Sequence, residues 1–411
     1  MAEPIDPFKA QALAFEASSV FTPSAPINDK ALFAGRIDQI RQVIDVVNQR
    51  GQHAIIFGER GVGKTSLANV LADFLSGGPV IVVRRINCDT GDSYDSVWKK
   101  IFEEIQFQQV AQVGGFGSVS QRPRSDAMAE IISPDVVRRQ LTLWSNQSQP
   151  VLVIDEFDRI DDRYRTIFAD TIKTLSDNAV RATVVFVGVA DNVENLISGH
   201  ESIQRALAQI KMPRMSEVEI REIITTGLTR LGMTIEPRVL SRIAVLSQGL
   251  PHYAHLLGLH STRAALDRLT GNIDMAVLDT AIRAAVGGVQ QSIRSAWQKA
   301  TLSSRKDNLF ADVLLACALA EVDDLGTFAS QDVRVPMQGI TGKPYDIPAF
   351  AQHLNEFSDD KRGNILKKIG GGRRFRYLFT NPLMPPYVIM RGFSDGKVSG
   401  ELLDTLVVNS F

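Results

Sequence analysis

The sequence predicts an α/β protein, with a parallel-sheet core followed by an all-helical region and then by helices and one hairpin. Three observations predict this order. Over 32–213, short and nearly continuous apolar runs alternate with helical patterns, which is typical of strands buried on both faces of a parallel sheet. Over 216–303, apolar residues recur every three or four positions, with no strand signal. Over 308–396, helical patterns precede a glycine-rich hairpin.

Composition places the chain among ordinary globular proteins. Its 411 residues suffice for two or three domains, and 45 Lys and Arg against 46 Asp and Glu leave a net charge of −1. Attraction to nucleic acid therefore has to come from a local patch. Cys88 and Cys317 cannot form a disulfide framework, so we expect a reducing, cytoplasmic location. We expect no signal peptide and no contact with a membrane, because the longest apolar run, 313–320, is too short to span one.

The core elements are expected where apolar runs end at turns. A helix is expected over 64–75, where Leu67, Val70 and Leu71 share a face with Phe74 and Leu75. The glycine- and serine-rich segment 114–124 breaks the alternation; we interpret it as a surface loop, and an insertion that meets DNA or a partner is the alternative. The expected strands are 53–57, 80–86, 151–154 and 183–189.

The strongest motif is a phosphate-binding loop. Residues 58–65, GERGVGKT, follow the apolar run HAIIF and open a helix, which is the strand–loop–helix context that the P-loop pattern requires. Glycines let successive N–H groups face phosphate oxygens, and the helix N-terminus adds its positive dipole end. Lys64 would reach the β- and γ-phosphates of ATP, and Thr65 would offer its hydroxyl to Mg²⁺. The predicted nucleotide-binding residues are Gly58, Glu59, Arg60, Gly61, Val62, Gly63, Lys64, Thr65 and Ser66.

Acidic residues follow two other expected strands. The run VLVIDE, 151–156, places Asp155 at the carboxyl end of a buried strand, where it would hold Mg²⁺ or its waters. Glu156 would orient and polarise the attacking water as a general base. The strand 183–189 leads to Asp191, which would contact the γ-phosphate or that water, and a helix cap is the competing interpretation.

Together these residues resemble the AAA+ ATPases, and more narrowly their origin-recognition and replication-initiator branch, over about 32–396. LFAGR, 32–36, is similar to that branch's segment near the adenine, and GERGVGKTS and VLVIDE are similar to its Walker A and Walker B. GVADN, 188–192, resembles its sensor 1, with Asp191 where the branch usually has Asn. SIQRAL, 202–207, resembles its arginine-finger segment, so the resemblance makes Arg205 the finger, with a solvated arginine as the alternative. A finger implies an active site completed by oligomerisation.

The chain departs from that branch in the helical region. GLPHY, 249–253, places His252 where the branch has its sensor 2 arginine. The same Gly-x-Pro sequence resembles the STAND signalling ATPases, a second and weaker resemblance.

The C-terminal region is similar to the winged helix that ends those initiators. Asp346 would cap a helix over 347–357, whose polar face includes Gln352 and Asn355 and has the position of a recognition helix. Gly370, Gly371 and Gly372 permit a tight hairpin, with Ile365, Phe375 and Tyr377 pointing inward.

This hairpin concentrates positive charge. Seven of the seventeen residues from 361 to 377 are Lys or Arg, and none is acidic. We expect the hairpin to contact DNA phosphates, and a solvated hairpin, or one paired with acids such as Asp359 and Asp360, is the alternative. The predicted DNA contacts are Lys367, Lys368, Arg373, Arg374 and Arg376.

We therefore predict an ATP-hydrolysing P-loop NTPase whose nucleotide state controls subunit assembly and binding to double-stranded DNA. Its cofactors would be ATP and Mg²⁺, its partners a second copy of itself and a chain carrying nuclease, helicase or transposase activity. Replication, transposition and defence against mobile DNA stay open. The alternative is a STAND-like signalling switch that does not bind DNA. The predicted parts are an N-terminal extension, 1–30, ordered in part at most; an ATPase core, 31–213; a helical lid, 214–304; a winged-helix domain, 305–396; and a tail, 397–411.

Overall fold

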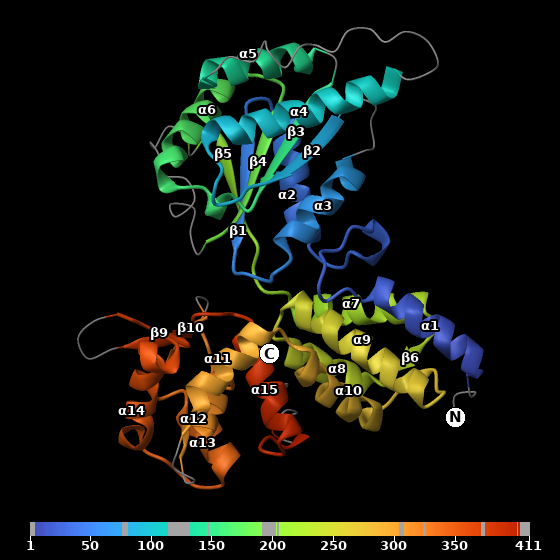
Figure 1. Cartoon of the computed structure of the whole chain (residues 1–411), viewed down its shortest axis with the longest axis vertical. Helices are drawn as coiled ribbons and strands as arrows, with labels where there is room; N and C mark the ends of the chain where they lie inside the picture. Colours follow the sequence, from blue (N-terminus) through green and yellow to red (C-terminus); the bar gives the residue numbers. More distant parts are fainter. Residues whose placement is uncertain are drawn as a thin grey trace. The chain divides into compact units, whose positions relative to one another are not determined.

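The computed structural model describes most of the chain, in two compact units (Figure 1). One unit is Pro26–Pro213, and the other joins Met1–Ala25 to Arg214–Phe411. The described residues are 5–75, 81–113, 131–146, 148–190, 203, 205–303, 308–323, 326–370, 375–400 and 402, without the side chains of 106–113.

The unit Pro26–Pro213 is built on a five-stranded sheet in the order β2-β3-β4-β1-β5. Every neighbouring pair is parallel, which confirms the predicted sheet. Residues of β1, β3 and β4 are almost all buried, because these strands have a neighbour on each side and helices on both faces. The strands are β1 (His53–Gly58), β2 (Ile81–Asn87), β3 (Gln149–Asp155), β4 (Thr183–Val189) and β5 (Leu207–Lys211).

Helices cover both faces of this sheet. In Figure 1, α4, α5 and α6 lie over one face. The buried cluster that these helices form with the sheet includes Trp98 of α4, Phe168 of α6 and Phe186 of β4. The other face receives α2 and α3, which contact β1. The bounds are η1 (Lys30–Leu32), α2 (Ile37–Asn48), α3 (Lys64–Leu75), α4 (Tyr94–Val113), α5 (Pro134–Ser145), η3 (Phe157–Arg159), η4 (Asp162–Tyr164) and α6 (Arg165–Asp177).

The second unit begins with a helical part that follows the predicted pattern, with one addition. Two-residue strands, β6 (Thr234–Ile235) and β7 (Asn272–Ile273), pair in parallel, where the sequence shows no strand signal. Ser216 and Glu219 form a reciprocal capping box at the start of α7, which fixes where the helix begins. The helices are α7 (Glu217–Arg230), α8 (Pro237–Ser247), α9 (Pro251–Asp267), α10 (Met275–Gly288) and α11 (Gln291–Thr301).

The N-terminal segment differs from the expected extension. It forms α1 (Pro7–Val20), which packs on α9. Phe21, at the end of α1, is 1% exposed and enters a slot between Gly227 and Gly258. A Cβ on Gly258 would lie 2.6 Å from the Phe21 ring, so the slot exists because both positions lack a side chain.

The C-terminal part has the element order of the predicted winged helix. A helix, a short strand and two helices lead into an antiparallel sheet of order β8-β10-β9. The winged-helix assignment itself stays a prediction. The bounds are α12 (Phe310–Ala318), β8 (Phe328–Ala329), α13 (Arg334–Thr341), α14 (Ile347–Phe357), η7 (Asp360–Arg362), β9 (Leu366–Ile369), β10 (Arg376–Phe379) and α15 (Met384–Ser394).

The hairpin departs from prediction at one inward position. Ile365 and Tyr377 are buried, as expected, but Phe375 is 38% exposed. The Lys368 ammonium lies over the Phe375 ring, 3.8 Å from its centroid. Phe375 precedes β10, so the alternation of that strand does not turn its side chain toward the core.

The slot around Phe21 makes α1 a structural element of its unit. We expect Phe21→Ala to lower the free energy of unfolding by about 3–5 kcal/mol, because it leaves a cavity that two glycines cannot fill. Phe8→Ala is the matched control, since Phe8 is 84% exposed, and should change stability by less than about 0.5 kcal/mol. Urea denaturation followed by circular dichroism measures both. Equal stabilities of the two variants would show that α1 is not docked in solution.

Candidate functional site

The P-loop joins the carboxyl end of β1 to the first turn of α3. Gly58, Gly61 and Gly63 all have positive φ, which residues with a Cβ rarely adopt. A Cβ on Gly58 would collide with the carbonyl oxygen of Met212, just after β5. The glycines of the motif are therefore required by backbone conformation and, at Gly58, by close packing.

Lys64 is buried at the centre of this loop. Its ammonium donates to the carbonyl oxygens of Gly58, at 2.9 Å, and Glu59, at 2.6 Å. Burial lowers the pKa of Lys64 to about 8, and the negative charges of Asp158, Asp155 and Glu59 act in the opposite direction. The ammonium is thus held by two carbonyls and lies within the field of three carboxylates.

Arg36, in the segment expected near the adenine, contacts the same loop. The residue is 3% exposed, and its guanidinium donates to the carbonyl oxygens of Val62, at 3.0 Å, and Pro213, at 2.7 Å. Both bonds use one nitrogen, Nη2, so a single guanidinium ties the P-loop to the chain that leaves β5.

Asp155 ends β3, two strands away from β1, and is 2% exposed. One carboxylate oxygen accepts from the Glu156 backbone N–H at 2.8 Å. The other is 2.8 Å from Nη2 of Arg85, on β2. Sequence analysis missed Arg85, because the sequence alone does not tell whether Arg84 or Arg85 lies on the same face of the sheet as Asp155. Only the pairing of β2 with β3 decides this.

Glu156 leaves the strand in the left-handed conformation, with φ of 56°. Its side chain is 42% exposed and lies 3.4 Å from Nη2 of Arg159, a weak ion pair across one turn. The carboxylate therefore stands free of the sheet, beside the buried Asp155, where a water could reach it.

Asp158 is a second residue that sequence analysis missed. Its carboxylate accepts from the backbone N–H of Val189, at 2.7 Å, and so fixes the end of β4. It is also the first of the carboxylates that raise the pKa of Lys64. The signal was present in the sequence, as an acid three positions after Asp155.

The other predicted residues are spread over both units. Arg205 is exposed ahead of β5, and its carbonyl accepts from Gln52 at 2.7 Å. His252, at the sensor 2 position, lies with Nδ1 2.7 Å from the carbonyl oxygen of Pro23. Asp191 and the loop segment 114–124 lie outside the described residues.

The basic hairpin is described on its two strands only. Lys367 and Lys368 are exposed on β9, and Lys368 donates to Asn355 of α14 at 2.9 Å. Arg376 has a structural contact: it pairs with Asp323 at 3.0 Å and donates to Thr327. Arg373 and Arg374 lie outside the described residues.

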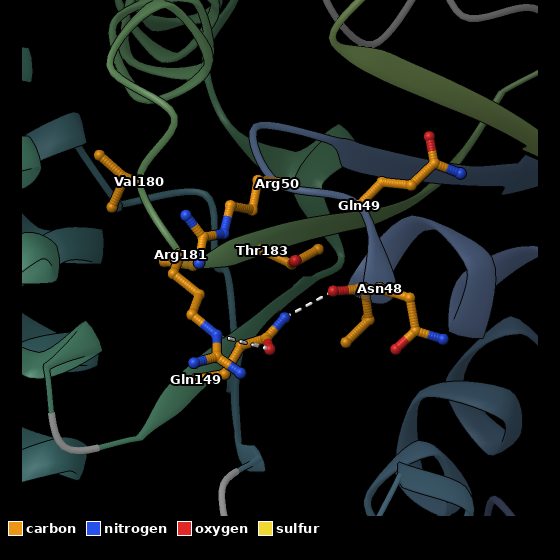
Figure 2. Close-up of a pocket in the computed structure, with 9 residues that line it drawn as sticks. Asn48, Gln49, Arg50, Gln149, Val180, Arg181 and Thr183 are labelled. Carbon is orange, nitrogen blue, oxygen red and sulfur yellow. Dashed lines mark hydrogen bonds between the residues drawn. The ribbon is translucent and has the colours of Figure 1, made fainter.

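A separate hollow of about 230 Å³ lies at the opposite, amino edge of the sheet (Figure 2). The Gln149 side-chain amide donates to the carbonyl oxygen of Val47 and accepts from Arg181, which Figure 2 shows beside it. Gln149 and Thr183 begin β3 and β4, whereas the P-loop follows the carboxyl end of β1. This hollow is therefore not the phosphate site.

The comparisons with known proteins agree with this geometry. Residues 26–356, more than half of the chain, match the family described as novel STAND NTPase 1. The chain belongs to the novel STAND NTPase 1 family. This member is accordingly a P-loop NTPase, as the sequence predicted. No curated protein matches the chain.

Several solved structures are similar to this chain at low sequence identity. A Walker-type ATPase of Pyrococcus abyssi has a TM-score of 0.52 and 14% identity, with 90% of this chain and 99% of that one covered. Cdc6p of Pyrobaculum aerophilum has a TM-score of 0.46, 15% identity, and coverage of 96% and 98%. ORC1 of Aeropyrum pernix, solved in complex with DNA, has a TM-score of 0.42, 15% identity, and coverage of 95% and 97%. At 14% identity, the similarity to the Pyrococcus abyssi ATPase shows a shared fold and nothing more. The predicted resemblance to STAND ATPases is confirmed, and the resemblance to origin-recognition AAA+ ATPases stays a prediction.

The residues present fit the Mg²⁺ that this class of enzyme implies. In the described part of the chain no three His, Cys, Asp or Glu side chains gather as a metal site. A nucleotide-bound Mg²⁺ needs none, because it takes most of its ligands from phosphates and water. Thr65 at the first turn of α3 and the buried Asp155 supply a hydroxyl and a carboxylate.

A search of the described helices found none with the length and apolar character that a membrane span requires.

The lowered pKa of Lys64 predicts a pH-dependent stability. In the unfolded chain Lys64 titrates near 10.5, so between pH 8 and 10.5 the unfolded state binds more protons. Unfolding free energy should therefore rise with pH across this window, by roughly 1.4 kcal/mol per pH unit, and should be flat below it. Lys64→Met removes this rise, and Lys99→Met, at an exposed site, should keep it. Denaturation curves at pH 7, 8, 9 and 10 measure the slopes; parallel curves for wild type and Lys64→Met would contradict the burial of a charged Lys64.

Proposed function

We propose that this chain is a Mg²⁺-dependent ATPase whose nucleotide state controls self-assembly and binding to double-stranded DNA. One observation carries the enzymatic part: Lys64, Asp155 and Glu156 come together at the carboxyl edge of one parallel sheet. The buried Cys88 and Cys317 are free thiols, which fits a reducing, cytoplasmic location.

The P-loop would hold the triphosphate. Gly61 and Gly63 turn the loop so that backbone N–H groups at the start of α3 face the phosphates. Lys64 would exchange its bonds to the carbonyls of Gly58 and Glu59 for bonds to phosphate oxygens. The remaining predicted nucleotide contacts are Arg60, Val62, Thr65 and Ser66.

The proposed metal site consists of Thr65 and Asp155. When bound, Mg²⁺ would neutralise charge on the phosphates. Glu156 is the proposed general base: its partly exposed carboxylate can accept a proton from a water that attacks the γ-phosphate. Asp191 is the proposed sensor for that phosphate.

Assembly would complete this site in trans. Arg205 is exposed before β5, within the same compact unit as the P-loop, and so is accessible to a neighbouring subunit. A guanidinium supplied by the next copy would stabilise charge on the γ-phosphate. The core of 31–213, the lid of 214–304, the winged helix of 305–396 and the tail of 397–411 are the domains we propose.

DNA binding is assigned to the C-terminal part. Lys367 and Lys368 are exposed on one hairpin strand, next to α14, whose outward residues include Gln352 and Asn355. These lysines, with Arg373 and Arg374, would contact phosphates, while α14 would enter the major groove. Arg376 is proposed to act indirectly, because its contacts with Asp323 and Thr327 anchor the hairpin.

The process that uses this binding is left open among replication, transposition and defence against mobile DNA. Any nuclease, helicase or transposase chemistry would belong to a partner chain. The alternative is a signalling switch whose winged helix packs on the nucleotide domain; exposed lysines on the hairpin are not needed for that role.

Glu156→Gln tests the proposed base. We expect ATP turnover to fall by about 10²–10⁴-fold, since a general base contributes that much, while nucleotide binding is kept. Glu103→Gln, an exposed acid on α4, is the matched control and should hydrolyse ATP normally. Phosphate release measures turnover, and a fluorescent ATP analogue measures binding. Undiminished turnover in Glu156→Gln would remove the base from this residue.

A salt series tests the DNA interface. Binding of the full chain to a random-sequence duplex, with and without ATP, should weaken steeply as salt rises. In Lys367→Gln/Lys368→Gln the log–log slope should flatten by about 1.8, which corresponds to two lost phosphate contacts. Arg283→Gln, an exposed cation on α10, should keep the wild-type slope. Absence of binding even at low salt would favour the signalling alternative.

A further inference from the structure

Both oxygens of the Asp155 carboxylate have a donor from within the protein. Oδ1 accepts from the Glu156 backbone N–H, and Oδ2 lies 2.8 Å from Nη2 of Arg85. The side chain of Asp155 is 3% exposed and that of Arg85 is 26% exposed. Within the part of the chain that the structure describes, Arg85 is the cation at ion-pair distance from this carboxylate.

The register of the sheet puts Arg85 there. β2 pairs with β3 so that Arg85 is opposite Val153 and Asn87 is opposite Asp155. Side chains of paired residues in parallel strands point to the same face, so Arg85 lies on the face of Val153 and Asp155. Arg84 points to the other face, where Glu104 of α4 raises its pKa against the lowering by burial.

The guanidinium is fixed at two ends. Nη2 contacts Asp155, and Nη1 donates to the Asn69 side-chain oxygen on α3. Asn69 is itself held, because its amide nitrogen donates to the carbonyl oxygen of Ile27 at 3.3 Å. A planar guanidinium anchored in this way keeps its charge beside Asp155 at little further entropic cost.

We infer that Arg85 is a resident counter-ion of Asp155 that competes with the divalent cation for this carboxylate. A metal approaching Asp155 alone meets a carboxylate already neutralised by the guanidinium. Phosphate oxygens bring new negative charge, so the cation binds effectively only together with the nucleotide. This inference rests on the proposed metal role of Asp155 and adds a specificity residue: Arg85 makes metal binding dependent on nucleotide.

Mn²⁺ binding to the full chain tests the inference without relying on turnover. Free Mn²⁺ is measured by electron paramagnetic resonance, with and without ADP. Wild-type protein should bind Mn²⁺ weakly in the absence of ADP, and Arg85→Gln should bind it about tenfold more tightly, because the buried carboxylate loses its counter-ion. Arg84→Gln, on the opposite face, should match wild type, and Arg85→Lys, which keeps the charge, should change little.

The outcomes separate this inference from the proposed function. Mn²⁺ affinity that is unchanged or weaker in folded Arg85→Gln overturns the competition. A wild-type chain that binds no fluorescent ATP analogue overturns the proposed function instead. If Arg85→Gln does not fold, Asn69→Leu replaces it: freeing one end of the guanidinium should tighten Mn²⁺ binding by a few fold, and an unchanged affinity again overturns the inference.

Discussion

Buried charge at the carboxyl edge of the parallel sheet is the constraint on which the site depends. An ammonium at Lys64 and a carboxylate at Asp155 are each removed from water, which is costly unless every charge is paired. The fold satisfies both from within, through two carbonyls for Lys64, and a guanidinium and an N–H for Asp155. Binding at this edge is consequently an exchange of partners, so affinity reflects what a ligand offers beyond the contacts that it displaces.

The shape of the P-loop is set from outside the motif. The carbonyl oxygen of Phe57 accepts from the Met212 N–H at 2.7 Å, and the Met212 carbonyl leaves no room for a Cβ at Gly58. Arg36 ties Val62 to Pro213 on the other side. The chain leaving β5 therefore clamps the loop at its beginning and near its middle. The segment that follows the edge strand β5 thus helps to set the conformation of the P-loop. The short, mixed sequence of β5 does not indicate this role.

Sequence reasoning succeeded where information is local. The P-loop, the strand before it and Asp155 follow from spacing and apolar runs, because each depends on neighbours within a few residues. Phe21 could not be predicted as a core residue, since its slot is made by Gly227 and Gly258, which lie about two hundred positions away. Arg85 was hidden for the same reason: only the pairing of β2 with β3 separates its role from that of Arg84. Phe375 was expected to point into the core but is partly exposed, because it precedes the first residue of β10.

His252 stands where the initiator branch has an arginine, and it differs from that residue in charge and in the contact that it makes. Burial lowers the pKa of His252, so the ring is neutral at physiological pH, and a carbonyl partner requires that Nδ1 carry the proton. The residue then donates to Pro23, where an arginine would offer a charge. Four residues later, the N–H of Ile27 donates to Ser66 of α3 at 3.1 Å. Pro23 and Ile27 thus each have a contact within their own unit. The ring at the sensor 2 position therefore has a backbone carbonyl of the N-terminal segment as its partner.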